Sequence, residues 1–143
     1  METSIKKAAT PCRPCRYAAA LNINPKLAKV YYNRGNLRFL EGDLESALGD
    51  FDMAIQLDRK YVKAYNDRGI TRQEKGDLVG AISDFGDALK IPPDHAEAYA
   101  NRGIALLLQG KNAEAERDIT RSLTLKPSLG SFIEQRRAQI VHR

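Results

Sequence analysis

The chain has 143 residues, of which 43% are hydrophobic and 29% are charged, so it is long enough for one domain with its own core. It contains no run of about 18 apolar residues, and no transmembrane helix is expected. The formal net charge of +5 comes from residues 1–25 and 128–143, which makes nucleic acid an unlikely partner, because binding it calls for a basic stripe along the body of a protein.

The N-terminal segment, residues 1–25, contains both cysteines, Cys12 and Cys15. Two thiols are too few for the disulfide framework of a secreted fold, and no apolar stretch follows the first lysines as in a secretory signal. A redox Cys-x-x-Cys needs a strand–helix context, and a zinc site needs four ligands. The two histidines, His95 and His142, lie far away in the chain. We therefore expect no metal or redox site here, and a cytoplasmic protein.

The same segment is also expected to end in a helix. Tyr17 and Ala20 stand one period of 34 residues before a phenylalanine and an alanine of the repeat described next. This register predicts a helix over residues 15–23 that forms the second half of a degenerate unit. Pro11 interferes with a first half, so no complete unit is predicted within residues 1–25.

The middle of the chain is an internal repeat. Residues 26–59, 60–93 and 94–127 align without a gap at a period of 34 residues. The recurring residues are Tyr31, Tyr65 and Tyr99; Arg-Gly at 34–35, 68–69 and 102–103; Gly42, Gly76 and Gly110; Ala47, Ala81 and Ala115; Asp50, Asp84 and Asp118; and Phe51, Phe85 and Ile119. A period of this length is typical of arrays of helical hairpins.

Each repeated segment is expected to form two helices. In the first segment, a helical stretch over about 28–40 ends at Gly42, which suits the left-handed residue that follows a helix. Asp43 can cap the second stretch, 44–57, whose apolar residues recur at spacings of three and four. In the third segment the aspartate is absent, and Asn112 is expected to cap instead.

Three glycines recur in the middle of the first helices, at positions 35, 69 and 103. Glycine costs about 1 kcal/mol relative to alanine in a helix, so the repetition implies a repeated gain from close approach of the paired helix. The alanines at 47, 81 and 115 are expected to form the other half of this contact. The phenylalanine or isoleucine four residues later is expected to fill the gap towards neighbouring helices.

This pattern resembles the tetratricopeptide repeat: an aromatic residue, three residues and Gly, then Ala, three residues and Phe, then Pro. The resemblance covers residues 26–127 and departs where Arg59 replaces Pro and where Arg38 and Arg72 replace an aromatic residue. It implies an all-α fold, an α-α superhelix or solenoid of three helix hairpins with a partial N-terminal unit and a C-terminal capping helix.

The C-terminal segment, residues 128–143, follows the phase of a first helix through Phe132, Ile133 and Ile140. A capping helix over 130–142 is therefore predicted, since such arrays need one for solubility. The predicted organisation is an N-terminal segment (1–25), three repeats (26–59, 60–93 and 94–127) and the capping helix (128–143).

The resemblance also implies where a partner binds, because the first helices line the inner surface of such a superhelix. The candidate peptide-binding residues are Lys29, Tyr32, Asn33, Asn36, Phe39, Lys63, Asn66, Asp67, Gln73 and Asn101. An asparagine side chain offers both a donor and an acceptor, so a ladder of these asparagines could bind the backbone of an extended peptide. The alternative is a solvated face in which Ile104 and Leu107 only fill the array.

Some members of the family hold the terminal carboxylate of a chaperone tail in a clamp of Lys, Asn and Arg. The matching positions here are Tyr32, Asn36, Asp67, Glu97 and Asn101. Asn36 alone fits the clamp, and Asp67 and Glu97 would repel a carboxylate. We therefore expect no tight binding of acidic chaperone tails.

Arginines and aspartates recur in step. Arg34, Arg68 and Arg102 each stand 16 residues before Asp50, Asp84 and Asp118. Phosphate binding is one interpretation of the arginines. The favoured interpretation is an ion pair between a first and a second helix, which specifies register more than it stabilises.

The function expected from these observations is a non-enzymatic adaptor that binds a protein or peptide. No nucleophile elbow, phosphate-binding glycine loop or other catalytic constellation is present in the sequence, and no cofactor is implied. The alternative is a self-associating structural module, because an incomplete first unit and the helix carrying Phe132 and Ile133 can stack onto copies of the chain. An association with RNA is a third, weaker reading.

Overall fold

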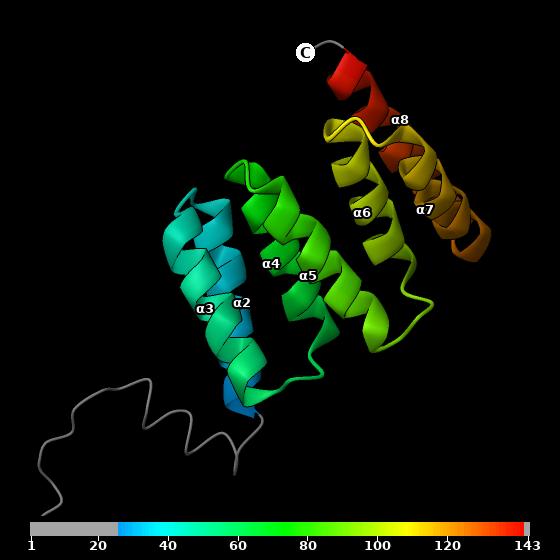
Figure 1. Cartoon of the computed structure of the whole chain (residues 1–143). Coiled ribbons are helices and arrows are strands. Elements are labelled where there is room, and N and C mark those ends of the chain that lie inside the picture. Colours follow the sequence, from blue (N-terminus) through cyan, green and yellow to red (C-terminus); the bar gives the residue numbers. More distant parts are fainter. Residues whose placement is uncertain (1–25, 142–143) are drawn as a thin grey trace, which may run out of the picture. The chain divides into compact units, whose positions relative to one another are not determined.

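The computed structural model describes residues 26–141, and over this part of the chain every regular element is a helix. The helices are α2 (Lys26–Leu40), α3 (Leu44–Leu57), α4 (Val62–Glu74), α5 (Leu78–Lys90), α6 (Ala96–Leu108), α7 (Asn112–Leu125) and α8 (Gly130–Val141), with a short 3-10 helix η2 (Pro127–Leu129) before α8 (Figure 1). The all-α fold expected from the sequence is confirmed. The helix predicted over 15–23, Cys12 and Cys15 lie outside the described residues.

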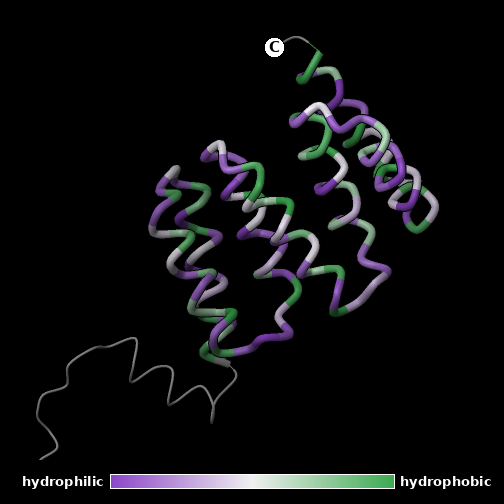
Figure 2. Tube along the Cα trace, in the orientation of Figure 1, coloured by the Kyte–Doolittle hydropathy of each residue, from purple (hydrophilic) through white to green (hydrophobic). Residues whose placement is uncertain are grey.

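The chain forms two compact units, with the division between Ala64 and Tyr65. In the first unit, α2 and α3 pack against each other as a hairpin. Polar and apolar residues are interspersed along these helices, as Figure 2 shows, and part of the apolar set is buried in the hairpin. Its core contains Tyr31 of α2 and Ala47, Phe51 and Ala54 of α3.

The second unit has two apolar clusters. One joins Ala81 and Phe85 of α5 to Ala105 of α6. The other joins α6, α7 and α8 through Ile104, Ile119 and Ile133, each at most 2% exposed. The helix predicted over 130–142 is therefore present as α8 and covers the end of this core. Burial of Ile133 also removes it from any surface for self-association, while Phe132 remains 39% exposed.

The turn within each hairpin follows the sequence signals. Gly42, Gly76 and Gly110 all have positive φ angles, between 83° and 91°, which favour glycine. Asp43 accepts a hydrogen bond from the backbone N–H of Ser46 and so caps α3 at its predicted first turn. The expected cap by Asn112 is wrong: α7 begins at Asn112 itself, and Lys111 occupies the cap position without a side-chain hydrogen bond.

The recurring mid-helix glycines allow the second helix of each hairpin to pack closely. The residues that contact them most closely are not the alanines that the sequence predicted. A Cβ atom at Gly35 would lie 2.8 Å from Phe51, and one at Gly69 would lie 2.6 Å from Phe85. At Gly103 the nearest atom belongs to Ile119, at 2.8 Å, with the backbone oxygen of Ala115 next. The ring or branched side chain, rather than the recurring alanine, therefore makes the closest contact, because it is long enough to reach the glycine.

Candidate functional site

The arginines and aspartates that recur in step form ion pairs within each hairpin. Arg34, Arg68 and Arg102 donate two hydrogen bonds each, of 2.7 to 3.1 Å, to Asp50, Asp84 and Asp118 respectively. Each guanidinium also lies 5.3 to 5.7 Å from the ring centre of the tyrosine three residues earlier. The structural interpretation is confirmed, because these arginines join the first helix of each hairpin to the second.

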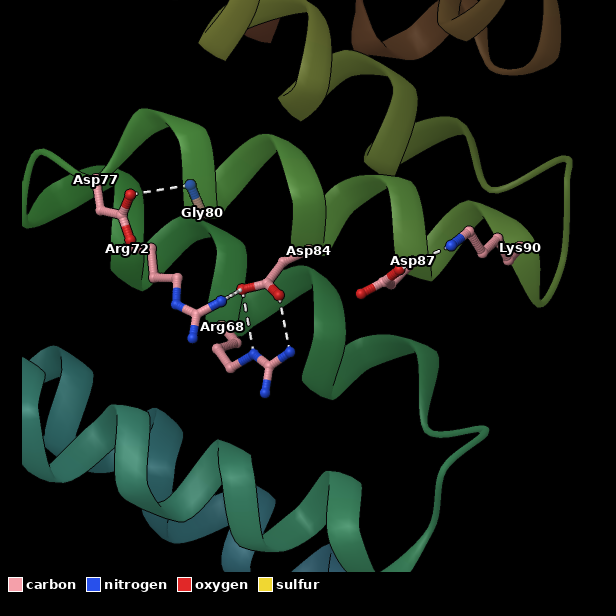
Figure 3. A network of polar contacts seen from close by, with 7 residues as sticks. All are labelled: Arg68, Arg72, Asp77, Gly80, Asp84, Asp87 and Lys90. Atoms are coloured by element: carbon pink, nitrogen blue, oxygen red, sulfur yellow. Dashed lines mark hydrogen bonds and ion pairs between the residues drawn. The ribbon is translucent and has the colours of Figure 1, made fainter.

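Two further arginines take part, which the sequence reasoning missed. Arg72 of α4 lies 2.9 Å from the Asp84 carboxylate on α5, and Figure 3 shows it reaching the same group as Arg68. Arg38 lies 3.2 Å from Asp50 in the first hairpin. Burial raises the pKa of the Asp84 carboxyl, while the hydrogen bond and charge of Arg68 act in the opposite direction. The two arginines had been noted only as replacements of an aromatic residue. Their i, i+4 spacing from Arg34 and Arg68 was the available signal.

In the first unit, the candidate peptide-binding residues lie on α2, apart from Lys63 at the start of α4. Lys29, Asn33 and Lys63 are exposed, while Asn36 and Phe39 are partly buried. Tyr32 stacks on Tyr61, with ring centres 4.9 Å apart, and lies 5.9 Å from the Phe51 ring. This aromatic group fixes the orientation of Tyr32, so that side chain presents a rigid and partly exposed ring.

In the second unit, two of the candidate asparagines are brought together. The side-chain amide of Asn101 on α6 donates a hydrogen bond of 3.0 Å to the amide oxygen of Asn66 on α4. Since each asparagine side chain has both a donor and an acceptor, this bond leaves the NH₂ group of Asn66 and the oxygen of Asn101 for another ligand. Both side chains are partly exposed. The pair thus offers N–H donors and one amide oxygen to an extended backbone.

Two carboxylates, those of Asp67 and Glu97, stand on the same helices as that pair. Asp67 follows Asn66 on α4, and Gln73 lies one to two turns further along the same helix. Glu97, in the first turn of α6, forms an ion pair with Lys126 at 2.5 Å. The hydrogen bond from Lys126 lowers the pKa of the Glu97 carboxyl, although partial burial opposes this effect. Glu97 is therefore ionised at neutral pH, and sequence reasoning had not identified Lys126 as its neighbour.

Two other residues of α6, the helix that carries Asn101, are not exposed. Ala100 is completely buried, and Ile104 is 1% exposed in the cluster with Ile133. For Ile104 this agrees with the alternative given above, in which the residue only fills the array, because both side chains lie in the core. His95 has a structural part as well: its Nδ1 accepts a hydrogen bond of 3.0 Å from the backbone N–H of Ala98 and caps α6.

Over residues 26–141, no group of three or more His, Cys, Asp or Glu side chains is placed to hold a metal ion. Within the same residues, no helix combines the length and apolarity that crossing a bilayer would need.

Comparison with known proteins places this geometry in a family. Two family models described as tetratricopeptide repeat match the chain, one at residues 28–61 and one at residues 66–129. None of the curated proteins searched matches the chain significantly.

Solved structures of tetratricopeptide repeat (TPR) domains are similar to it. The TPR domain of OM64 from Arabidopsis has a TM-score of 0.75 and 22% identity over 83% of this chain and 98% of that one. The first TPR domain of Spaghetti (RPAP3), bound to the HSP90 peptide SRMEEVD, has a TM-score of 0.73 and 21% identity over 82% and 96% of the two chains. The second TPR domain of that protein, bound to the same peptide, has a TM-score of 0.71 and 27% identity over 76% and 99%. With its repeated hairpins, its glycine contacts and both family models in agreement, the chain belongs to the tetratricopeptide repeat family.

Proposed function

We propose that this chain is a non-enzymatic, cytoplasmic adaptor that binds an extended segment of a partner protein on its first-helix surface. Each unit carries its own part of this surface: Lys29, Tyr32, Asn33, Asn36, Phe39 and Lys63 in the first unit, and Asn66, Asp67, Gln73 and Asn101 in the second. The observation that carries the proposal is the hydrogen bond between Asn66 and Asn101, which leaves a donor and an acceptor beside each other. TPR domains of similar fold bind a peptide in the two Spaghetti structures, which supports the same class of ligand here.

The chemistry of this surface favours a neutral or basic segment over an acidic one. Asp67 and Glu97 stand at positions where some family members hold a carboxylate, and Glu97 is ionised through its contact with Lys126. A second carboxylate brought close to these groups would be repelled. Amides that bind backbone groups favour an extended peptide whatever its side chains are. Peptides of different sequence are therefore expected to bind.

The test is the affinity of a peptide selected from a random dodecapeptide display library against the full chain. Asn66→Ala combined with Asn101→Ala is expected to weaken binding about tenfold or more, because two backbone hydrogen bonds are lost. Asn112→Ala is the matched control, since Asn112 is exposed at the start of α7, and should leave the affinity unchanged. Equal affinity of the double variant and the wild type, with the helical content retained, would remove the amide pair from the site.

Self-association through α2 is a second candidate function. Val30, Leu37 and Leu40 of α2 are 59%, 56% and 79% exposed and share one side of the helix. Two periods later, Ala98 and Ala105 of α6 stand at the positions of Val30 and Leu37 and are completely buried, and Ala105 packs against α5. The side of α2 that carries these residues therefore has the character of a packing surface, and a second copy of the chain is the partner we assign to it.

Light scattering over a range of protein concentrations tests this second candidate. A mass that rises with concentration, and returns to that of a monomer in Leu37→Ser with Leu40→Ser, is the expected result. A strict monomer at every concentration would instead leave the surface to residues 1–25 or to a different protein. The peptide-binding proposal is independent of this outcome.

A further inference from the structure

A fourth arginine continues the series of arginines that join the two helices of each hairpin. Arg136 of α8 stands one period after Arg102, which itself follows Arg34 and Arg68. Each of the three earlier arginines binds an aspartate through two hydrogen bonds. No such bond joins Arg136 to a carboxylate of residues 26–141, and Arg136 instead lines a pocket.

This pocket has a volume of about 520 Å³, within the range of ligand sites. It lies entirely within the second unit, between the α4–α5 turn, the end of α6 and the last turns of α8. Leu78, Leu108 and Ile140 give it an apolar part, and the amides of Gln73 and Gln139 lie at its wall. The pocket therefore combines a cation, hydrogen-bonding amides and apolar surface, which are the groups that bind a short peptide.

One side chain decides which kind of segment can approach α8. In the third hairpin Gly103 follows Arg102, and Ile119 lies 2.8 Å from the position that a Cβ atom would occupy there. In α8 the corresponding residue is Arg137, which has a long side chain in place of the glycine and pairs with Glu116 of α7 at 2.8 Å. The glycine that lets α7 approach α6 closely is therefore absent from α8. An extended segment, which is thinner than a helix, can bring a carboxylate to Arg136 without such a close approach.

The charges in the pocket also indicate which peptide segments can bind there. Glu74 lines the same pocket as Arg136, so the two opposite charges together favour a segment with one negative charge over a run of acidic residues. Within the chain, the aspartate bound by each arginine is followed directly by an apolar residue: Phe51, Phe85 or Ile119. An Asp-apolar dipeptide would place its carboxylate on Arg136 and its neighbouring side chain on Leu108 and Ile140.

We propose that the pocket between the α4–α5 turn and α8 binds an extended peptide segment through one aspartate side chain, held by Arg136, and an adjacent apolar side chain. Gln73 and Gln139 supply hydrogen bonds to its backbone. The ligand class rests on the proposed function, but this site is separate from the amide pair of Asn66 and Asn101. This pocket would recognise one side chain of the partner, whereas the amide pair would bind only backbone groups.

The probe is fluorescein-labelled Gly-Ser-Asp-Phe-Gly-Ser with an amidated C-terminus, titrated into the full chain and followed by fluorescence anisotropy. Arg136→Gln is expected to weaken binding about tenfold or more, the usual effect of losing hydrogen bonds to a charged group. Arg136→Lys should restore only part of the affinity, because lysine keeps the charge and loses the two-pronged geometry. Arg121→Gln, an exposed arginine on α7, is the matched control and should bind as the wild type does.

Peptide variants complete the test. The probe with Asn in place of Asp should bind about tenfold more weakly, and Gly-Ser-Gly-Phe with a free C-terminal carboxylate should not replace it. Equal binding of the Asp and Asn peptides, equal loss in Arg121→Gln, or binding of the free-acid peptide alone would overturn the proposal. Asn66→Ala with Asn101→Ala separates the two sites: failure at Arg136 with a retained effect of the asparagines would leave the proposed function standing.

Discussion

The three arginine–aspartate pairs differ in how much water reaches them. The side chain of Arg68 is 15% exposed and that of its partner Asp84 is 1% exposed, whereas Arg34 is 50% exposed. Buried ion pairs gain little net stability, because desolvation of both charges offsets their attraction, but removing one partner strands the other. The same sequence motif therefore has different energetic consequences in successive hairpins.

This difference predicts an order of stabilities. Asp84→Ala should lower the free energy of unfolding by about 3 kcal/mol, because two arginines lose their carboxylate in a water-poor site. Asp50 also holds two arginines, but Asp50→Ala should cost only about 1 kcal/mol, since Arg34 and Arg38 are 50% and 35% exposed and regain water more easily than Arg68. Urea unfolding followed by circular dichroism measures both variants. A larger loss in Asp50→Ala than in Asp84→Ala would show that burial does not control the effect.

The contact between Glu97 and Lys126 predicts a dependence on pH. Because Lys126 lowers the pKa of Glu97 in the folded chain, this contact stabilises the fold above the ordinary pKa of a glutamate. The contribution is lost as the pH falls through the lowered pKa. Lys126→Met should therefore cost about 0.5 kcal/mol at neutral pH, a value typical of partly exposed pairs, and nothing once Glu97 is protonated in both proteins. Unfolding curves at neutral and acidic pH measure this, and an equal difference at both would contradict it.

At the scale of the helix, the mid-helix glycines set the distance between paired helices. Gly69→Ala places a methyl group 2.6 Å from a carbon of the Phe85 ring, which must shift within a packed core. We expect a loss of about 2 kcal/mol from overpacking, despite the gain in helix propensity. Gly49→Ala is the matched control: Gly49 lies in α3 with no atom within 4 Å of the new Cβ, so this variant should gain about 0.5 kcal/mol.

Thermal unfolding measures both glycine variants. The account predicts opposite signs for chemically identical substitutions, and Phe85→Leu should recover part of the loss in Gly69→Ala by making room for the methyl group. A change in stability of the same sign in both variants would mean that close approach of the paired helix does not explain the glycine at position 69.

Most of the helical elements could be predicted from the sequence, because their signals are local. The Gly42-Asp43 turn places the start of α3 at Leu44, and the residues predicted for it, 44–57, are those observed. The cap of α7 was predicted wrongly: Asn112 is the first residue of the helix, and Lys111 stands at the cap position. The repeat period predicts where the helices lie. It predicts the residue that caps a helix only where that residue recurs at the period, as Asp43 and Asp77 do.

Among the polar contacts between helices, the arginine–aspartate pairs at a spacing of 16 residues follow the period and could be predicted. Asn66 and Asn101 are 35 residues apart, one more than the repeat, so alignment of the repeats pairs Asn101 with Asp67 instead. Arg38 and Arg72 contact Asp50 and Asp84 at a shared spacing of 12 residues, but the third repeat has no arginine at this position. Sequence therefore indicated which helices carry the candidate site, while the bonds within it needed coordinates.

For the whole molecule, the distribution of charge predicts which ligands are rejected. The HSP90 peptide SRMEEVD is bound to the two similar Spaghetti domains. The present chain carries Asp67 and Glu97 at positions where the family resemblance implies a carboxylate clamp. We expect no binding of this peptide in the micromolar range, by calorimetric titration. Asp67→Asn with Glu97→Lys should raise its affinity about tenfold or more, because a repulsion is replaced by an attraction. Micromolar binding by the wild type would contradict this assignment.

The most direct test of the central claim is to map where a selected peptide binds, using NMR spectroscopy of the ¹⁵N-labelled full chain. The account predicts that the side-chain amide resonances of Asn66 and Asn101 shift as the peptide is added, together with backbone resonances of α4 and α6. Shifts confined to the second helices α3, α5 and α7, with both asparagine side chains unchanged, would place the ligand elsewhere and contradict it.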